Sequence, residues 1–198
     1  MDTKLTIWLV TAMRAWVPVA GGEDREATEA RYASIAGDAA EVAQAEEPLF
    51  KGEHGVAKTA LLLLSVARYE SNFLASVDEG RKRGDGGKSW CLAQVLFPGD
   101  EAHRSLVVED GKYRWSHDAA EGWTGKDLVD DRRKCFTAAL AIARDSYKAC
   151  GNLSGYTSGH CSRTEKKAQV REGLAKAWFK GHVPPEPEPL TEPTAMLW

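Results

Sequence analysis

Apolar residues recur at intervals of three and four along the first part of the chain, which is the spacing of one face of an α-helix. One series predicts a helix that ends before Pro18, and it consists of Leu5, Leu9, Ala12 and Trp16. A second series predicts a helix within residues 23–45, and it consists of Tyr32, Ile35, Ala39 and Val42. Residues 56–70 are apolar on most sides, so we expect this third helix to be the buried, central one.

The middle of the chain is polar. Residues 78–88, DEGRKRGDGGK, predict a loop, because charged residues and glycines do not form a core. Residues 89–97 predict one strand of a small hairpin or an irregular turn, and residues 101–122 predict a loop with at most one short strand. Helical spacing returns in residues 125–149 and 164–179, on either side of a glycine-containing loop at 151–159. For the last helix the expected buried face consists of Val170, Leu174, Ala177 and Trp178.

The pattern therefore predicts a mostly α fold with a small β-hairpin or loop insert after the central helix. We expect a single domain over residues 1–182, in which the helices of residues 1–48 pack on a core formed by residues 49–182. Five of the eight prolines, mixed with glutamates, fall in the last fifteen residues. Residues 183–198 are therefore predicted to form a tail outside the packed domain.

The composition mainly excludes classes of protein. The 26 Lys and Arg residues against 29 Asp and Glu residues give a net charge of −3, which lacks the basic footprint of a dedicated nucleic-acid binder. The longest apolar runs, such as residues 60–64, are far shorter than the roughly 20 residues that cross a bilayer, so we expect no membrane span. The apolar stretch after Lys4 also has the look of a secretion signal, but Arg14 interrupts it and a folded helix is preferred.

Four cysteines leave the redox state open at this point. They are Cys91, Cys135, Cys150 and Cys161, and no two have the CxxC spacing of zinc ribbons or redox motifs. The even number allows two disulfides, which persist in oxidising compartments. Four reduced, buried thiols are the alternative, and a zinc site that includes Cys150, His160 and Cys161 is a further one.

Glu70 is the first candidate for chemistry. It stands in the last turn of the apolar helix, directly before the polar segment. A carboxyl that faces a cleft there would be partly desolvated, and desolvation raises a carboxyl pKa toward the range of a general acid. The alternative is an ordinary solvated charge at a helix end.

Three short motifs carry a family resemblance. They are Glu70-Ser71-Asn72-Phe73, then Cys91-Leu92-Ala93-Gln94, then Gly155-Tyr156-Thr157-Ser158-Gly159. In this order and spacing they resemble the lysozyme-like lytic transglycosylases and the goose-type lysozymes, whose members show Glu-Ser at a helix end, Gly-Leu-Met-Gln and Ala-Tyr-Asn-x-Gly. The resemblance covers about residues 56–179, and a narrower one is to members carried by bacteriophages. It implies the α+β lysozyme-like fold.

The resemblance also implies cleavage of the β-1,4 bond between N-acetylmuramic acid and N-acetylglucosamine in peptidoglycan, with no cofactor and no metal. Glu70 would protonate the glycosidic oxygen and then, as a carboxylate, accept the proton of the muramoyl 6-hydroxyl as an anhydro ring closes. Ser71 would bind the sugar, and Gln94 and Tyr156 would hydrogen-bond the substrate or Glu70. Aromatic rings such as those of Trp90, Trp115 or Trp123 would stack on the sugar rings.

If water attacks instead, a second carboxylate should position it. The carboxylates of the loop that follows Glu70 are the candidates, namely Asp78, Glu79 and Asp85. Cys91, Ala93 and Thr157 replace the glycine, methionine and asparagine of the family motifs. These departures favour an alternative function, a non-catalytic phage or wall-binding structural protein that has kept the fold.

The placement on this fold also favours two disulfides. Cys150–Cys161 would close the loop around Tyr156, and Cys91–Cys135 would tie the insert to the helical body. An enzyme of this family works outside the cytoplasm, in the periplasm or cell wall, or on a virion. We expect a monomer that binds peptidoglycan glycan strands, unless the chain is part of a phage particle.

Overall fold

The computed structural model describes residues 2–99 and 104–186. Its first three helices are α1 (Thr3–Trp16), α2 (Arg25–Ala45) and α3 (Gly55–Ser71), as the apolar spacing predicts. Aspartates cap the first two: the Asp2 carboxylate accepts the Leu5 N–H, and the Asp24 carboxylate accepts the Ala27 N–H. The segment after Lys4 is thus a helix of the core, with Leu5 and Leu9 buried against its neighbours.

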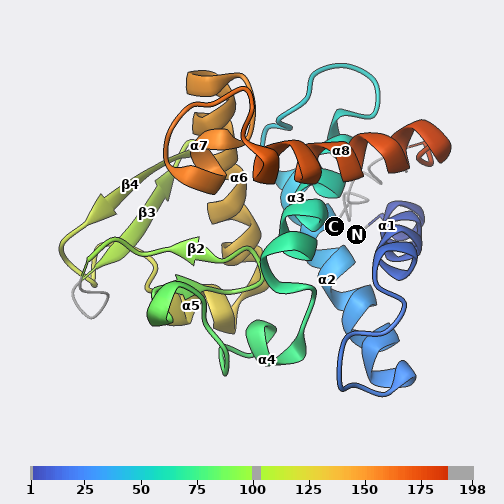
Figure 1. Ribbon diagram of the computed structural model, residues 1–198, viewed down its shortest axis with the longest axis horizontal. Helices are drawn as coiled ribbons and strands as arrows, with labels where there is room; N and C mark the ends of the chain where they lie inside the picture. The colour runs from blue at the N-terminus through green and yellow to red at the C-terminus, as the bar shows by residue number, and fades with distance from the viewer. Residues whose placement is uncertain (1, 100–103, 187–198) are drawn as a thin grey trace, which may run out of the picture.

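Helix α3 lies at the centre of the molecule. Every residue from Thr59 to Ala67 is buried, because α1, α2, α6 and α8 pack around it (Figure 1). Asn72 ends the helix in the left-handed conformation, with φ 54°, and Phe73 follows with the same φ. Asparagine is a common residue at such a helix end, whereas a fully buried phenylalanine at positive φ is held there by its surroundings.

Two antiparallel hairpins follow the short helix α4 (Ala75–Asp78) and a single 3₁₀ turn, η1 (Asp85–Gly87). In the first hairpin β1 (Ser89–Trp90) pairs with β2 (Val95–Leu96), so the segment 89–97 is a complete small hairpin. The second joins β3 (Ser105–Glu109) to β4 (Lys112–Ser116). The loop predicted for residues 101–122 is therefore wrong: Asp110 and Gly111, both at positive φ, form a two-residue turn that closes a five-residue ladder.

The C-terminal half is helical, with more breaks than the sequence indicates. The predicted helix 125–149 is two helices, α5 (Gly125–Asp130) and α6 (Arg132–Cys150), because Asp131 is extended and its carboxylate caps α6 at the Arg133 N–H. The segment 151–159, predicted as a loop, contains α7 (Ser154–Ser158). The last helix is α8 (Lys166–Gly181). The predicted tail begins at residue 183, and its residues 187–198 lie outside the described part of the chain.

Helix α8 buries a different face from the one predicted. Its buried residues are Ala168, Arg171, Ala175 and Trp178, whereas Val170 is 43% exposed and Ala177 is exposed. Trp178 and Phe179 pack edge-to-face against Trp16 and Trp8 of α1, so the two ends of the described chain share one interface. An arginine on the buried face of α8 needs a partner in the interior.

Both predicted disulfides are present. Cys91–Cys135 joins the β1–β2 turn to α6, and Cys150–Cys161 closes the segment that holds α7. The second disulfide uses both thiols that the zinc alternative requires, and among the described residues no group of His, Cys, Asp and Glu has the arrangement of a metal site. Figure 1 shows the β3–β4 hairpin on the side of α6 that faces away from α1. Within the described ranges, no helix has the length and apolar character of a membrane span.

Candidate active site

Glu70 lies in the last turn of α3, beside a cavity of about 310 Å³. The cavity is bounded by the end of α3, by the segment that leads through α4 to β1, and by the β1–β2 turn. Its lining includes Glu70, Ser71 and Gln94 among the residues of the three motifs. The Glu70 side chain is 21% exposed, so the carboxyl is largely desolvated while still open to solvent. Glu70 thus lies where the buried helix meets the cavity, at the junction that the sequence predicts.

Arg171 pairs directly with Glu70. Its Nη2 and Nε donate to the same carboxylate oxygen, Oε1, at 2.6 and 3.1 Å. The guanidinium is held in turn by the Lys167 carbonyl, 2.6 Å from Nη1, and the Arg171 side chain is only 7% exposed. This pair connects α3 to α8 across 101 residues of sequence. No motif of the sequence identifies Arg171, although its position among buried residues of α8 is a clue.

The pKa of Glu70 is raised above the usual range of a glutamate. Burial is the largest cause, because a desolvated carboxylate loses hydration of its charge. The Arg171 guanidinium acts in the opposite direction by charge and by hydrogen bonding, and Lys167 adds a smaller lowering effect. Asp85 raises the pKa further through its like charge. The net effect increases the protonated fraction of Glu70 near neutral pH relative to an ordinary carboxyl.

Ser71 is buried and its hydroxyl has partners within the helix end. Its Oγ donates to the Ala67 carbonyl at 2.7 Å and accepts the Phe73 N–H at 3.3 Å. These bonds stabilise the unusual turn after Glu70. The side chain is 4% exposed and lines the cavity, so a bound sugar would meet a hydroxyl that already donates to the backbone.

Gln94 closes the β1–β2 turn from the opposite wall of the cavity. Its Nε2 donates to the Cys91 carbonyl at 2.9 Å, and its Oε1 accepts the Gly84 N–H at 2.8 Å. A Cβ at Gly84 would lie 2.3 Å from that oxygen, so only glycine permits this approach. The amide of Gln94 thereby fixes the β1–β2 turn to the preceding loop.

Tyr156 brings the third motif to the same place. Its hydroxyl donates to the Ala93 carbonyl at 2.8 Å, in the turn of the second motif. The pKa of Tyr156 is raised well above its ordinary value by burial, and the charge of Glu70 adds to the rise. The three motif segments therefore meet around Glu70, and the side chains of Ser71, Gln94 and Tyr156 form hydrogen bonds with the protein itself. Their contacts with a substrate stay predictions.

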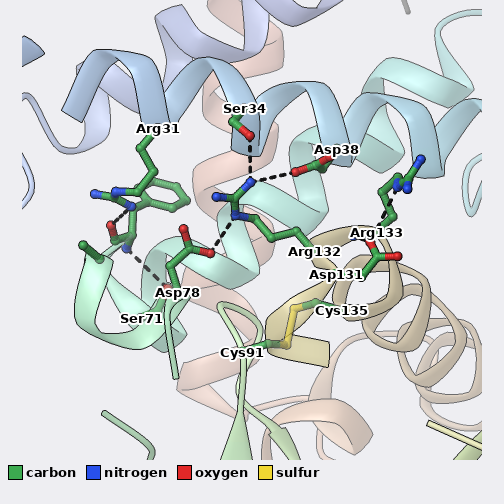
Figure 2. A network of polar contacts seen from close by, with 12 residues as sticks. Arg31, Ser34, Asp38, Ser71, Asp78, Cys91, Asp131, Arg132, Arg133 and Cys135 are labelled. Carbon is green, nitrogen blue, oxygen red and sulfur yellow. Dashed lines mark hydrogen bonds and ion pairs between the residues drawn. A yellow bond between two sulfur atoms is a disulfide. The ribbon is translucent and has the colours of Figure 1, made fainter. Parts of the chain in front are cut away.

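The three loop carboxylates lie in different environments. Asp78 is buried and its Oδ1 pairs with Arg132 Nε at 2.7 Å, which turns it away from the cavity toward α2 and α6 (Figure 2). Glu79 pairs with Arg81 on the surface. Asp85 accepts a hydrogen bond from Ser89 and is the acidic residue of the three whose charge acts on Glu70. Among these three loop carboxylates, Asp85 is therefore the one that is electrostatically coupled to Glu70.

The tryptophans singled out in the sequence belong to the packing around the hairpins. Trp115 packs edge-to-face on Phe97, with ring centroids 4.8 Å apart, and the backbone of Trp123 pairs with that of Leu106. The Arg83 guanidinium lies 4.1 Å above the Trp90 ring. Among the described residues that line the Glu70 cavity, the aromatic one is Tyr69, which is 42% exposed. Tyr69 is a stacking candidate that sequence reasoning missed.

Comparison of the chain with models of protein families, with curated proteins and with solved structures finds no match in any of the three.

Proposed function

We propose that this protein cleaves the glycan strands of peptidoglycan, with Glu70 as general acid. The observation that carries the proposal is the placement of Glu70: a carboxyl with a raised pKa at the end of the buried helix α3, open to a cavity that two of the three motif segments line. A general acid needs this combination of desolvation and access. The resemblance to lytic transglycosylases and goose-type lysozymes supplies the substrate.

The proposed reaction is transglycosylation. Glu70 donates its proton to the glycosidic oxygen as the bond breaks, and the resulting carboxylate then accepts the proton of the muramoyl 6-hydroxyl, which closes a 1,6-anhydro ring. One carboxylate serves both steps because an internal hydroxyl replaces water. If water attacks instead, Asp85 is the loop carboxylate proposed to position it, because its charge acts on Glu70 whereas Asp78 and Glu79 are paired with arginines. The two products differ by one water in mass.

One observation favours a second candidate function. The Arg171 pair stabilises ionised Glu70, and Ser71, Gln94 and Tyr156 already have protein partners. A site in this state suits a non-catalytic phage or wall-binding protein that binds the glycan without cutting it. The two disulfides support a location outside the cytoplasm for either function, in the periplasm or cell wall or on a virion.

The deciding experiment compares three proteins on purified peptidoglycan, with the released fragments identified by mass spectrometry. The wild type should release anhydromuramoyl ends. Glu70→Gln should lose at least about a hundredfold in rate, as expected for removal of a general acid, while its amide oxygen can still accept the Arg171 bonds and preserve the fold. Glu53→Gln is the matched control, because Glu53 is an exposed glutamate at the other end of α3.

The outcomes separate the candidates. Reducing muramic acid ends would show that water attacks. Binding of all three proteins to peptidoglycan without any release of fragments would establish the non-catalytic alternative. Glu70→Gln retaining more than about a tenth of the wild-type rate would remove Glu70 from the acid role.

A further inference from the structure

The cavity beside Glu70 has a positively charged wall. Arg68, Lys82 and Arg83 line it, and Glu70 is its one acidic residue among the lining residues that the structure describes. Glu70 itself is paired with Arg171. The local surplus of positive charge contrasts with the net charge of the whole chain, which is −3. It is therefore a property of this site and not of the surface in general.

Of the three acidic residues in the segment after α3, two are paired elsewhere, and the third, Asp85, accepts a hydrogen bond from Ser89 and lies outside the cavity lining. Asp78 is turned into the interior against Arg132, and Glu79 is paired with Arg81. Arg83 lies over the Trp90 ring, so the argument rests on the other two cations. Arg68 is half-buried in the last turn of α3, two residues before Glu70. Lys82 is exposed on the loop across the cavity, and its backbone N–H donates to the Ser76 carbonyl.

Arg68 is also prepared for an anion. Its guanidinium lies 5.6 Å from the centroid of the Tyr69 ring, within the range of a cation–π contact. A planar guanidinium binds a carboxylate through two parallel hydrogen bonds, and a lysine on the opposite side adds a point charge. A substrate without carboxylates would gain little from either group.

We propose that Arg68 and Lys82 form a subsite for a carboxylate of the peptide stem that is attached to the muramic acid at the cleavage point. This inference rests on the proposed function for the identity of the polymer, and it names the part of that polymer which the site selects. The site then prefers stem-bearing, negatively charged strands over strands of the same sugar sequence whose stems are neutral. In this proposal each cation contributes to binding, and Glu70 carries out the proton transfer.

The test measures binding in a background that does not cut. Glu70→Gln protein is mixed with insoluble peptidoglycan whose stem carboxylates are intact, or with the same material after the carboxylates have been converted to amides. The fraction of protein that sediments gives an apparent dissociation constant. We expect binding to intact material to be about three- to tenfold tighter at low salt, and the preference to shrink as ionic strength rises.

Variants locate the preference. Adding Lys82→Gln should remove most of it while leaving binding to the amidated material unchanged, and Arg68→Gln should do the same. Lys88→Gln is the matched control, because Lys88 is exposed on the same loop and is absent from the cavity lining. Lys82 is exposed, so its substitution should not change the unfolding midpoint. A circular dichroism melt checks both variants.

Each result decides something. Equal binding to intact and amidated material, or no binding to either, overturns the subsite. A preference that Lys82→Gln and Lys88→Gln reduce equally overturns its location. A preference that depends on Lys82, in a protein that releases no fragments from either material when Glu70 is restored, upholds the subsite and refutes the proposed cleavage.

Discussion

Arg132 holds together three elements around a buried carboxylate, and its removal should destabilise the fold more than that of any neighbouring arginine. Its Nε donates to Asp78, whose side chain is 4% exposed, and its Nη1 donates to Asp38 and Ser34 of α2 at 3.0 and 2.7 Å (Figure 2). Arg132→Met keeps most of the apolar stem and deletes the guanidinium. Asp78 then stays buried without its cation.

Removing one partner of a buried ion pair costs about 3–5 kcal/mol, since the remaining charge is left uncompensated in the interior. The Arg132 side chain is 27% exposed, so water can reach part of the site and the lower end applies. We expect Arg132→Met to lower the free energy of unfolding by about 3 kcal/mol. Unfolding in urea, monitored by tryptophan fluorescence, measures this free energy. The slope of the free energy of unfolding against urea concentration should be the same as in the wild type, which checks for two-state behaviour.

Arg133 provides the matched control. It stands in the same first turn of α6, but its side chain is 60% exposed, and its distances to carboxylates are 3.5 Å for Asp131 and 3.7 Å for Glu41. Arg133→Met should therefore cost less than about 1 kcal/mol. Combining Arg132→Met with Asp78→Asn should restore part of the lost stability, because the buried charge of Asp78 is removed together with its cation, while Asp38 is more exposed. A loss for Arg132→Met no larger than that for Arg133→Met would refute the reasoning.

Two further predictions concern the pH profile and the disulfides. Arg171 lowers the pKa of Glu70, so this pKa should rise further in Arg171→Met. The acid form then persists to higher pH, and the alkaline limb of the pH–rate profile for cleavage shifts to higher pH. An alkaline limb that stays at the same pH or shifts to lower pH would contradict this. Replacing Cys91 and Cys135 together by serine should cost about 4 kcal/mol of stability, against about 3 kcal/mol for the other disulfide, because the closed loop spans 44 residues instead of 11. Unfolding midpoints in urea would rank the two, and the reverse order would show that chain entropy does not dominate.

The parts of the fold that the sequence predicts are those with local, periodic causes. Tyr32, Ile35, Ala39 and Val42 all fall on the buried side of α2, because their spacing alone determines a shared face. The second hairpin escapes prediction although Asp110-Gly111 is a strong turn dipeptide. Three consecutive residues of β3, beginning at Ser105, are buried on both sides, so the strand lacks the alternation that identifies a half-buried sheet.

The residues of the candidate site likewise fall into those that the sequence predicts and those that it does not. The position of Glu70 at the end of the core helix follows from the apolar run before it. Arg171 does not follow, since nothing local relates residues that are 101 positions apart. The apolar spacing predicts the wrong face of α8, because Arg171 occupies a buried position at which that spacing expects an apolar residue. A charged residue in such a position indicates a buried partner, and here the partner is the candidate acid.

The long span between Glu70 and Arg171 also sets an order of events during synthesis. A ribosome adds about 5–20 residues per second, so α3 exists for roughly 5–20 s before the codon for its partner is read. Throughout that interval α8 cannot dock, and the Glu70 carboxyl lacks both of its hydrogen bonds from Arg171. The guanidinium that pairs with Glu70 and lowers its pKa is thus acquired only with the last helix of the described chain, and a nascent chain carries all three motifs before it carries this partner.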